Sequence, residues 1–317
     1  MDLGLNELAW SLVDDLMENP EDFRILIQDL AEGGTIIDMG ISTEGGLDAG
    51  MMMATICMAG LADVYLAPGT LSSWHWPHVT VQTDFPVPAC LYSQYAGWKL
   101  EVGKFYGMGS GPMRAAAAHE PLFDRLWYRE RSDKVVGIVE TASLPTEEVF
   151  AEIAQKTGVS PSNIVLLVAP TSSFVGNYQV TARSVETALH KLLELGFDVH
   201  RVRSAYGVAP LPPVARNDLE GIGRTNDAIL YGGRVTLWVT GDDESLAEIV
   251  PHIPSQASPM HGQTFLEVFE TAGRDFYRID PLLFSPAEVV VHNLETGRVH
   301  VSGQVRPDIL LRSFGLS

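Results

Sequence analysis

Residues 135–168 read VVGIVETASLPTEEVFAEIAQKTGVSPSNIVLLV, and this stretch shows the plainest alternation of secondary structure in the chain. Its two ends, residues 135–140 and 164–168, are short apolar runs that predict buried strands. Between them, residues 147–156 predict a helix. A strand–helix–strand unit of this kind indicates that helices pack in layers against a sheet.

Working outward from this unit, helical and strand patterns intermix without a uniform βαβ period. We therefore expect an α+β fold with mixed α/β layers rather than one doubly wound sheet. The expected helices cover residues 6–17, 48–61, 89–98, 113–126, 178–196, 218–230 in part, 265–272 and a short C-terminal segment. The expected strands cover residues 23–30 and 35–41 as a hairpin, 64–66, 78–83, 104–108, 198–203, 234–239, and 289–292 with 299–302 as a second hairpin. The Pro-rich segment 208–213 is expected to be a linker or the wall of a cleft.

The length and charge of the chain limit its function. A chain of 317 residues predicts two domains, which we place at residues 1–130 and 131–317 while allowing that either is discontinuous in sequence. Forty acidic against 21 basic residues give a net charge of −19. This balance argues against binding to nucleic acid or to an anionic membrane surface, because both need clustered Lys and Arg.

Cysteine usage and apolar runs indicate the compartment. Cys57 and Cys90 are far apart in sequence, which excludes a disulfide scaffold and predicts a reducing cytoplasm. The first residues contain no basic segment, so we expect no signal peptide. The longest uncharged apolar run, residues 49–62, is shorter than the about 20 residues that a membrane-spanning helix needs. We therefore expect a soluble protein.

A glycine-rich turn between an expected strand and an expected helix is a candidate anion site. Gly109, Ser110 and Gly111 are followed by Pro112 and Arg114. Backbone N–H groups at a helix start attract anions, and a guanidinium binds a carboxylate or phosphate in a bidentate manner. The pattern is neither a complete P-loop nor a dinucleotide fingerprint. The alternative is an ordinary tight turn before a helix.

One face of the expected helix 178–196 carries polar residues. At about 100° per residue, Gln179, Arg183, Glu186 and His190 share one side, while apolar residues occupy another. The polar side is either a solvated stripe with a weak ion pair or an acid–base group in a cleft. Arg before Glu is the less favourable order for a stabilising pair.

Two further segments are candidate ligand contacts. The first runs from Gly221 through Thr225, Asn226 and Asp227, where small and polar residues suit either a loop around a polar pocket or an ordinary turn cluster. The second, residues 93–98, begins with Ser93 and Gln94 and suits either contact with a heterocycle or a half-buried helix. The histidines form no HxH or HExxH pattern, so we expect no metal site.

These same segments make the chain resemble the methenyltetrahydromethanopterin cyclohydrolases of one-carbon metabolism. The resemblance is carried by segments dispersed along nearly the whole chain: Asp48-Ala49-Gly50, Gly60-Leu61-Ala62-Asp63-Val64, Ala89-Cys90-Leu91, Ser93-Gln94, Ala96-Gly97-Trp98, Met108-Gly109-Ser110-Gly111-Pro112, Val168-Ala169-Pro170-Thr171, Val185-Glu186-Thr187, Thr225-Asn226-Asp227, Asp275-Phe276-Tyr277, Ile279-Asp280-Pro281 and Leu283-Phe284. It implies a two-domain α/β chain that forms homotrimers, with the pterin substrate bound between the domains.

The resemblance also implies an activity and its residues. The reaction is reversible hydrolysis of 5,10-methenyltetrahydromethanopterin to 5-formyltetrahydromethanopterin, without a metal or a nucleotide cofactor. The family's proposed catalytic pair falls on Arg183 and Glu186, with Glu186 as the general base. The expected substrate contacts are Ser93, Gln94, Gly109, Ser110, Gly111, Arg114, Thr225, Asn226 and Asp227, with Arg114 on the anionic tail and Arg224 as a weaker candidate. Two alternatives are a cyclohydrolase for another carrier, such as tetrahydrofolate, and a pterin-binding protein without activity.

Overall fold

The computed structural model describes residues 3–275 and 278–316. Phe276 and Tyr277, two of the residues that carry the family resemblance, lie outside the described residues. The chain forms two compact units, and each is discontinuous in sequence. The first unit contains Met1–Ala62 and Pro88–Gln179, and the second contains Asp63–Val87 and Val180–Ser317.

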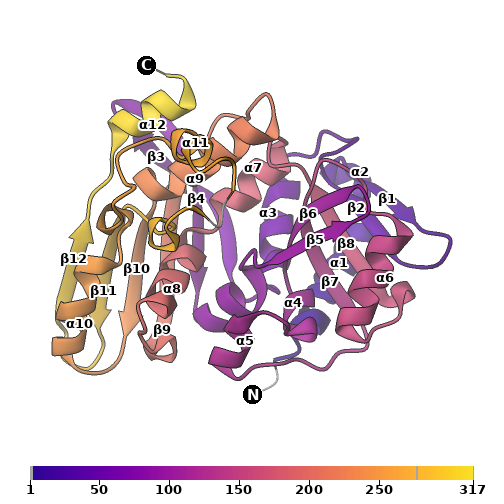
Figure 1. Cartoon of the computed structure of the whole chain (residues 1–317), viewed down its shortest axis with the longest axis horizontal. Coiled ribbons are helices and arrows are strands. Elements are labelled where there is room, and N and C mark those ends of the chain that lie inside the picture. Colours follow the sequence, from indigo (N-terminus) through magenta and orange to yellow (C-terminus); the bar gives the residue numbers. More distant parts are fainter. Residues whose placement is uncertain (1–2, 276–277, 317) are drawn as a thin grey trace. The chain divides into compact units, whose positions relative to one another are not determined.

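The first unit is built on a six-stranded sheet with the order β1-β2-β8-β7-β6-β5 (Figure 1). Its strands are β1 (Leu26–Asp29), β2 (Thr35–Asp38), β5 (Trp98–Val102), β6 (Phe105–Ser110), β7 (Val135–Glu140) and β8 (Ile164–Ala169). Strands β2, β8 and β7 are parallel, and the outer strands are antiparallel. Its helices are α1 (Leu5–Glu18), α2 (Pro20–Phe23), α3 (Leu47–Cys57), α4 (Met113–Ala117), α5 (Pro121–Leu126), α6 (Glu147–Thr157), the short turn η2 (Pro161–Asn163) and α7 (Phe174–Thr181), which crosses into the second unit.

Helices cover both faces of this sheet. Ile37 and Leu167 pack with residues of α1 and α3 in one apolar cluster. Their neighbours Ile36 and Leu166 pack with residues of α4 and α6 in another. Successive residues of a strand point to opposite faces, so a sheet buried on both sides needs uninterrupted apolar strands. The first unit is therefore a three-layer α/β/α structure.

The second unit has another six-stranded sheet, with the order β12-β11-β10-β9-β4-β3. Its strands are β3 (Asp63–Leu71), β4 (Trp74–Thr83), β9 (Val202–Pro210), β10 (Arg234–Val239), β11 (Glu288–Asn293) and β12 (Val299–Gly303), all antiparallel except the pair β10 and β11. Its helices and short turns are α8 (Ser184–Glu194), η3 (Val199–Arg201), α9 (Asp218–Gly232), α10 (Asp243–Ile249), η4 (Val250–His252), η5 (Ser255–Ala257), α11 (Phe265–Thr271), η7 (Pro281–Leu283) and α12 (Pro307–Phe314).

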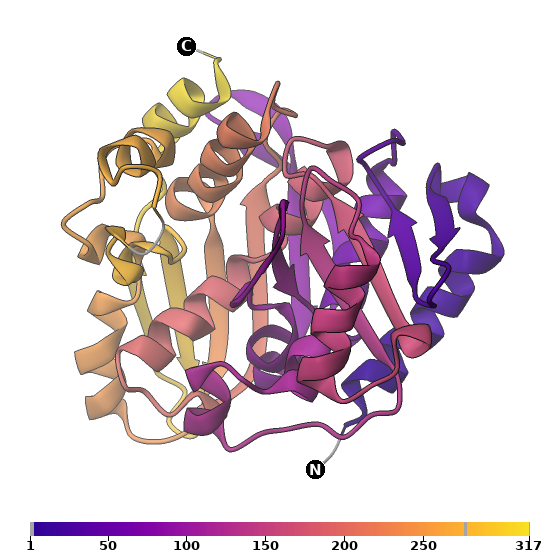
Figure 2. The same ribbon diagram turned by 45° about the vertical axis from the view of Figure 1, so that its right-hand side comes forward.

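Strands of the second sheet alternate between buried and partly exposed residues. In β10, for example, Val235, Leu237 and Val239 are buried while Thr236 and Trp238 are only partly so. Helices α8 and α9 contact strand β9, and Figure 2 shows α8 lying across the strands. This alternation is typical of a sheet covered by helices on one face. The expected α+β fold with two domains is confirmed.

Strand pairing crosses the boundary that the sequence suggested at residue 130. Strand β6 lies before that position and β7 after it, and the two pair antiparallel through Gly109 and Val139. Residues 130 and 131 therefore both belong to the first unit. In the described part of the chain, no helix combines the length and the apolar character needed to cross a membrane.

The helix expected over residues 113–126 is two short helices, α4 and α5. Ala118 adopts a left-handed backbone conformation (φ 43°) and ends α4. Pro121 then begins α5, and Glu120 before it is extended. A proline lacks the N–H that would continue a helix, and it disfavours helical backbone in the residue before it. The apolar spacing hid this break.

The helix expected over residues 178–196 is also divided, into α7 and α8. Residues 182 and 183 form a turn between the two helices. The N–H of Arg183 donates to the carbonyl of Val180 at 3.2 Å, an i to i−3 bond of the kind that tightens a helix end. Arg183 and Glu186 therefore lie at the beginning of α8 rather than in the middle of one long helix.

Three more expectations about local structure need correction. Residues 199–201 form η3, and the strand β9 extends from Val202 to Pro210, so half of the expected Pro-rich linker lies in the sheet. The expected polar loop from Gly221 belongs to helix α9. The helix expected over residues 89–98 is a wide π-type helix, η1 (Val87–Gln94), followed by strand β5.

Candidate functional site

The candidate residues are distributed over both units, and each set is described by itself. The first unit holds Ser93, Gln94, Gly109, Ser110, Gly111 and Arg114. The second unit holds Arg183, Glu186, Thr225, Asn226 and Asp227.

In the first unit the end of β6 lies beside the end of the wide helix η1. The N–H of Gly111 donates to the carbonyl of Ser93 at 2.9 Å, and the Ser93 hydroxyl donates to the carbonyl of Cys57 at 2.7 Å. The hydroxyl of Ser110 lies 3.5 Å from the Cys57 thiol. The structure thus brings Ser93, Ser110 and Gly111 together, although the Gly111 amide that we considered for an anion is already paired.

At both glycine positions of this turn, Gly109 and Gly111, a side chain would be sterically unfavourable. Gly111 has φ +86°, a conformation that side chains rarely adopt. At Gly109, a Cβ atom would lie 2.8 Å from the Met113 side chain and 3.1 Å from the Trp98 carbonyl. These requirements explain the glycines through chain geometry and strand packing, without a ligand.

Arg114 is fully buried and its guanidinium meets protein groups. Nε and Nη2 donate to the two carboxylate oxygens of Glu120 at 2.8 and 2.6 Å. Nη1 donates to the carbonyls of Leu91 and Ser93, each at 3.1 Å. The rings of Tyr95 and Phe123 lie 5.0 and 5.2 Å from the guanidinium carbon.

This arrangement differs from the expected role of Arg114 as an anchor for the substrate's anionic tail. Its planar fork is matched to the Glu120 carboxylate in the bidentate geometry that guanidinium favours. Its Nη1 donates to two carbonyls in the second half of η1, and one of them, that of Ser93, also accepts the N–H of Gly111. Arg114 therefore holds the backbone that presents Ser93 and Gln94. The sequence did not identify Glu120, because the pair depends on the turn between α4 and α5.

In the second unit, Arg183 and Glu186 are both buried at the beginning of α8. Arg183 is the N-cap residue, and its carbonyl accepts the N–H of Thr187 at 3.0 Å. Glu186 lies in the first turn, where the helix dipole favours a negative charge. The burial of both side chains rules out the solvated stripe that was the alternative explanation for this polar face.

Close packing fixes the start of α8 against β9. A Cβ atom at Gly207 would lie 2.5 Å from the Ser184 hydroxyl and 2.8 Å from a Val185 methyl group. Only a residue without a side chain leaves room for α8 at this height above the sheet. Gly207 was not predicted, since its importance depends on a residue 23 positions earlier in the chain.

Lys191 fixes the other end of α8. Its ammonium group donates to the carbonyl of Leu282 in η7. The side chain is 1% exposed, and burial lowers the pKa of Lys191 to about 8, while the nearby Asp280 acts in the opposite direction. A buried ammonium group is costly unless it is hydrogen-bonded, and this bond to Leu282 connects α8 to η7.

The three candidates on α9 have local or internal partners. The Thr225 hydroxyl donates to the Gly221 carbonyl at 2.9 Å, and the Asn226 amide donates to the Ile222 carbonyl at 2.9 Å. The Asp227 carboxylate accepts the N–H of Phe265 at 2.7 Å, which ties α9 to the first residue of α11. Asp227 and Thr225 are buried, whereas Asn226 is partly exposed.

Burial also changes the acidity of Asp227. It raises the pKa of this carboxyl to about 7, against hydrogen bonds from Ser313 and from the Phe265 amide, which lower it. The neutral form of the Asp227 carboxyl is therefore populated near neutral pH.

Arg224, the weaker candidate for contact with the substrate's anionic tail, donates to the carbonyls of Pro213 and Val214 at 3.3 and 3.2 Å.

Polar residues at the carboxyl ends of the parallel strands in the first unit were not predicted. Asp38 ends β2 and accepts the N–H groups of Gly40, Ile41 and Ser42 at 2.7–3.0 Å. Glu140 ends β7 and accepts the hydroxyl of Thr171, which follows β8, at 3.5 Å. Ligands bind at this edge in open sheets with parallel strands. Polar residues directly after buried strands were the signal that could have identified them.

Metal-ligating residues do not gather in the described ranges, 3–275 and 278–316. No group of three or more His, Cys, Asp or Glu side chains there could hold a metal ion. Cys57 and Cys90 are both buried as free thiols. The expectation that the protein needs no metal or other cofactor stays a prediction.

The family of the chain follows from its similarity to known proteins. Residues 4–314 match the model of the family described as Cyclohydrolase (MCH). The chain belongs to this cyclohydrolase family. It is 44% identical over 315 residues to the methenyltetrahydromethanopterin cyclohydrolase of Methylobacillus flagellatus, covering 99% of this chain and 96% of that protein.

Two other cyclohydrolase relatives give the same result. The protein of that name from Rhodopirellula baltica is 46% identical over 289 residues, which are 90% of this chain and 87% of the relative. The one from Methanococcoides burtonii is 39% identical over 316 residues, with 99% of each chain covered. The resemblance inferred from dispersed sequence segments is thereby confirmed.

Proposed function

We propose that the chain catalyses the reversible hydrolysis of 5,10-methenyltetrahydromethanopterin to 5-formyltetrahydromethanopterin. The observation that carries the proposal is the family match over residues 4–314, together with relatives of that name along nearly the full length. The substrate is a cation whose methenyl carbon lies between two nitrogens and is already electrophilic. The enzyme has to place a water molecule at this carbon and accept a proton from it.

Glu186 is the proposed general base. One proton of the attacking water passes to its carboxylate while the oxygen bonds to the methenyl carbon. The bond from this carbon to the second nitrogen then breaks, that nitrogen takes up a proton, and one proton is released overall. A positioned base contributes about 10²–10⁴-fold to such a step. The burial of Glu186 supports the role, because electrostatic interactions are stronger away from solvent.

Arg183 is the proposed partner of this base. It would orient the Glu186 carboxylate and stabilise negative charge on the oxygen of the adduct. The support is that both residues are buried at the beginning of α8, three positions apart. The close packing of Ser184 on Gly207 restricts where this turn can lie, and such positioning is itself a large contribution to catalysis.

The remaining candidates are proposed to bind the substrate. They are Ser93, Gln94, Gly109, Ser110, Gly111, Thr225, Asn226 and Asp227. Arg114 is proposed to act on this set indirectly, through the carbonyls of Leu91 and Ser93. From the family resemblance we further propose that the chain works as a homotrimer in the cytoplasm and needs no metal or nucleotide.

The test is the decay of methenyl absorbance with two substrates, the methenyl derivatives of tetrahydromethanopterin and of tetrahydrofolate. We expect rapid decay with the first and a kcat/KM at least 100-fold lower with the second. Comparable or faster decay with the tetrahydrofolate derivative would assign the enzyme to that carrier. Tight pterin binding without decay of either compound would identify a binding protein.

A further inference from the structure

The end of helix α5 and the segment after it, residues 125–134 of the first unit, concentrate positive charge in an acidic protein. Arg125, Arg129, Arg131 and Lys134 fall within ten positions of a chain that has 21 basic residues and a net charge of −19. Lys134 is engaged with Glu7 at 3.1 Å. By contrast, neither Arg129 nor Arg131 makes a hydrogen bond or an ion pair with any residue in the described part of the chain.

Glu130, between these two arginines, turns inward and fixes the segment. It is buried, and its carboxylate accepts the N–H of Asn6 at 3.0 Å and the Asn6 side-chain amide at 2.8 Å. Its own N–H donates to the carbonyl of Ala115 at 2.9 Å. Glu130 is thus buried between two exposed arginines, Arg129 and Arg131.

The two arginines line one pocket. It has a volume of about 770 Å³, and its lining is Ala116, Arg129, Glu130, Arg131, Ser132, Asp133 and Thr157. The pocket lies entirely within the first unit. Thr157 ends helix α6, whose C-terminal partial negative charge is complemented by Lys156 in its last turn. Glu130 and Asp133 balance the formal charges of the two arginines in this lining. Glu130 is buried, however, and the exposed residues Arg129, Arg131 and Asp133 together carry one net positive charge.

We propose that this pocket binds a small anion that carries phosphate or carboxylate groups. Within the described residues, the two guanidinium groups have no hydrogen-bond or ion-pair partner, and Glu130 anchors the backbone between them. They are therefore available as bidentate donors for such oxygens. In a chain of net charge −19, a local positive site is needed for any anionic ligand to approach. The anion is either part of the substrate, whose tail carries phosphate and carboxylates according to the family resemblance, or a separate metabolite.

The direct test is calorimetric titration of the full chain with inorganic pyrophosphate at low ionic strength. We expect one saturable site. Arg129→Ala/Arg131→Ala should weaken the binding at least about tenfold, because a hydrogen bond to a charged group contributes about 1.5–3 kcal/mol and about 1.4 kcal/mol corresponds to a tenfold change in affinity. Asp133→Asn should tighten it about threefold by removing a repulsive charge. Arg129 and Arg131 are exposed, so the double variant should keep the wild-type melting temperature.

A matched control removes the same charge elsewhere. Arg203→Ala/Arg234→Ala deletes two exposed arginines of β9 and β10 in the second unit. Its pyrophosphate affinity should remain within about twofold of wild type. Absence of saturable binding, or equal weakening by both double variants, would overturn the proposal.

Steady-state kinetics then distinguish the two sources of the anion, and this part rests on the proposed function. If the ligand is the substrate tail, Arg129→Ala/Arg131→Ala raises KM for the complete substrate and leaves KM unchanged for one shortened by its phosphate and carboxylates. If the ligand is a separate metabolite, both KM values stay unchanged while pyrophosphate affinity falls. Pyrophosphate binding needs no turnover, so a failure of the proposed hydrolysis would not be confused with a failure of this site.

Discussion

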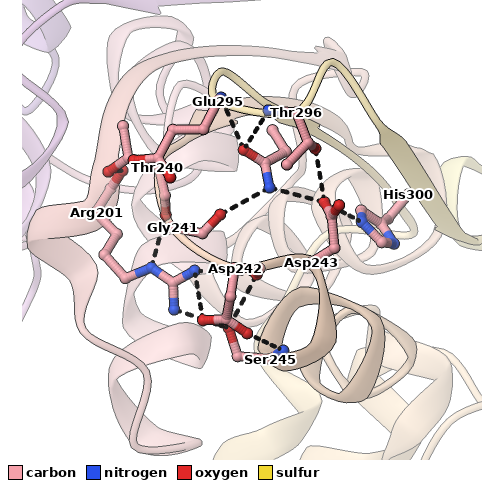
Figure 3. A network of polar contacts seen from close by, with 10 residues as sticks. Arg201, Thr240, Gly241, Asp242, Asp243, Ser245, Glu295, Thr296 and His300 are labelled. Atoms are coloured by element: carbon pink, nitrogen blue, oxygen red, sulfur yellow. Dashed lines mark hydrogen bonds and ion pairs between the residues drawn. The ribbon is translucent and has the colours of Figure 1, made fainter.

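Two clusters of arginines and carboxylates, one in each unit, differ mainly in their access to water. In the first unit, the Arg114 side chain is 0% exposed and that of Glu120 is 8% exposed. In the second unit, a network links Arg201, Asp242 and Asp243 to the turn between β11 and β12 (Figure 3). There each ion pair has one exposed member: Asp242 is 64% exposed against 20% for Arg201, and Arg298 is 71% exposed against 15% for Asp243.

This difference shows why the number of ion pairs does not measure their contribution to stability. Exposed pairs gain little, because water solvates the separated charges almost as well. Removing one member of a buried pair leaves an unpaired charge in a poorly solvated site. The first cluster should therefore govern the stability of the first unit, whereas the second should mainly hold a surface turn in place.

The largest effect is expected for Arg114→Ala. It removes the guanidinium donor of the buried Glu120 carboxylate and of the Leu91 and Ser93 carbonyls, although the Ser93 carbonyl keeps the N–H of Gly111. The unpaired carboxylate should lower the free energy of unfolding by about 3–5 kcal/mol. Arg114→Lys should recover only part of this loss, since one ammonium cannot replace a bidentate fork. Chemical denaturation of the full chain measures both changes.

A double-mutant cycle with Glu120→Ala is the control for this prediction. The double variant should be more stable than the sum of the two single losses implies, because it leaves no unpaired charge. A loss below about 1 kcal/mol for Arg114→Ala would show that water reaches this pair and that the two clusters do not differ as described.

An intermediate effect is expected for Asp227→Asn, which compares a buried acid of the second unit with the exposed ones. Burial raises the pKa of Asp227 from 3.8 to about 7. Unfolding therefore releases a proton between these pH values, and the stability of the wild type falls as the pH rises through this window. The substitution should remove this dependence of the free energy of unfolding on pH. Relative to the wild type, the variant should therefore gain on the order of 3 kcal/mol of stability between pH 4 and pH 8.

The measurement is the free energy of unfolding of both proteins from pH 4 to pH 8. The asparagine oxygen can still accept the N–H of Phe265, so the contact with α11 is kept in the variant. Parallel pH profiles for the two proteins would mean that Asp227 is ionised in the folded state throughout and that its burial does not matter.

The smallest effect is expected for Asp243→Asn, because the cation paired with Asp243, Arg298, is largely exposed to water. Hydrogen bonds from Thr296 and Asn293 lower the pKa of Asp243 although partial burial opposes them, so the charged form prevails above pH 4. Removing the charge should lower the melting temperature by no more than about 2 °C, and 1 M KCl should abolish the difference. A larger decrease in melting temperature that does not depend on salt would show that this network stabilises the protein as the buried pair of Arg114 and Glu120 does.

The sequence predicted the parts of the fold in which local pattern and burial agree. Strands β7 and β8 are buried on both faces, so their apolar runs are continuous and easily recognised. The breaks at Ala118 and at residues 182–183 were missed, because apolar residues keep their helical spacing on both sides of each break. Pro121 was a signal for the first break, but the apolar spacing was given more weight. At residues 182 and 183 neither a proline nor a glycine marks the second break.

The candidate site was less predictable for the same reason. Arg114 was recognised as a potential ligand group, but its partner Glu120 is defined only by the turn that brings α5 back. Gly207 and Lys191 act on α8 through contacts with distant segments, which no local pattern contains. Helical spacing grouped Arg183 and Glu186 on one helix, which the structure divides at residues 182 and 183. Their catalytic roles came from the family resemblance alone and stay a prediction.

The most direct test of the account is the turnover number of Glu186→Gln, measured by methenyl absorbance decay. Glutamine keeps the size of the side chain but accepts no proton, so kcat should fall at least about 100-fold while KM changes little. An unchanged melting temperature would show that the fold is intact. Near-normal turnover in a folded Glu186→Gln variant would contradict the account and remove Glu186 from the mechanism.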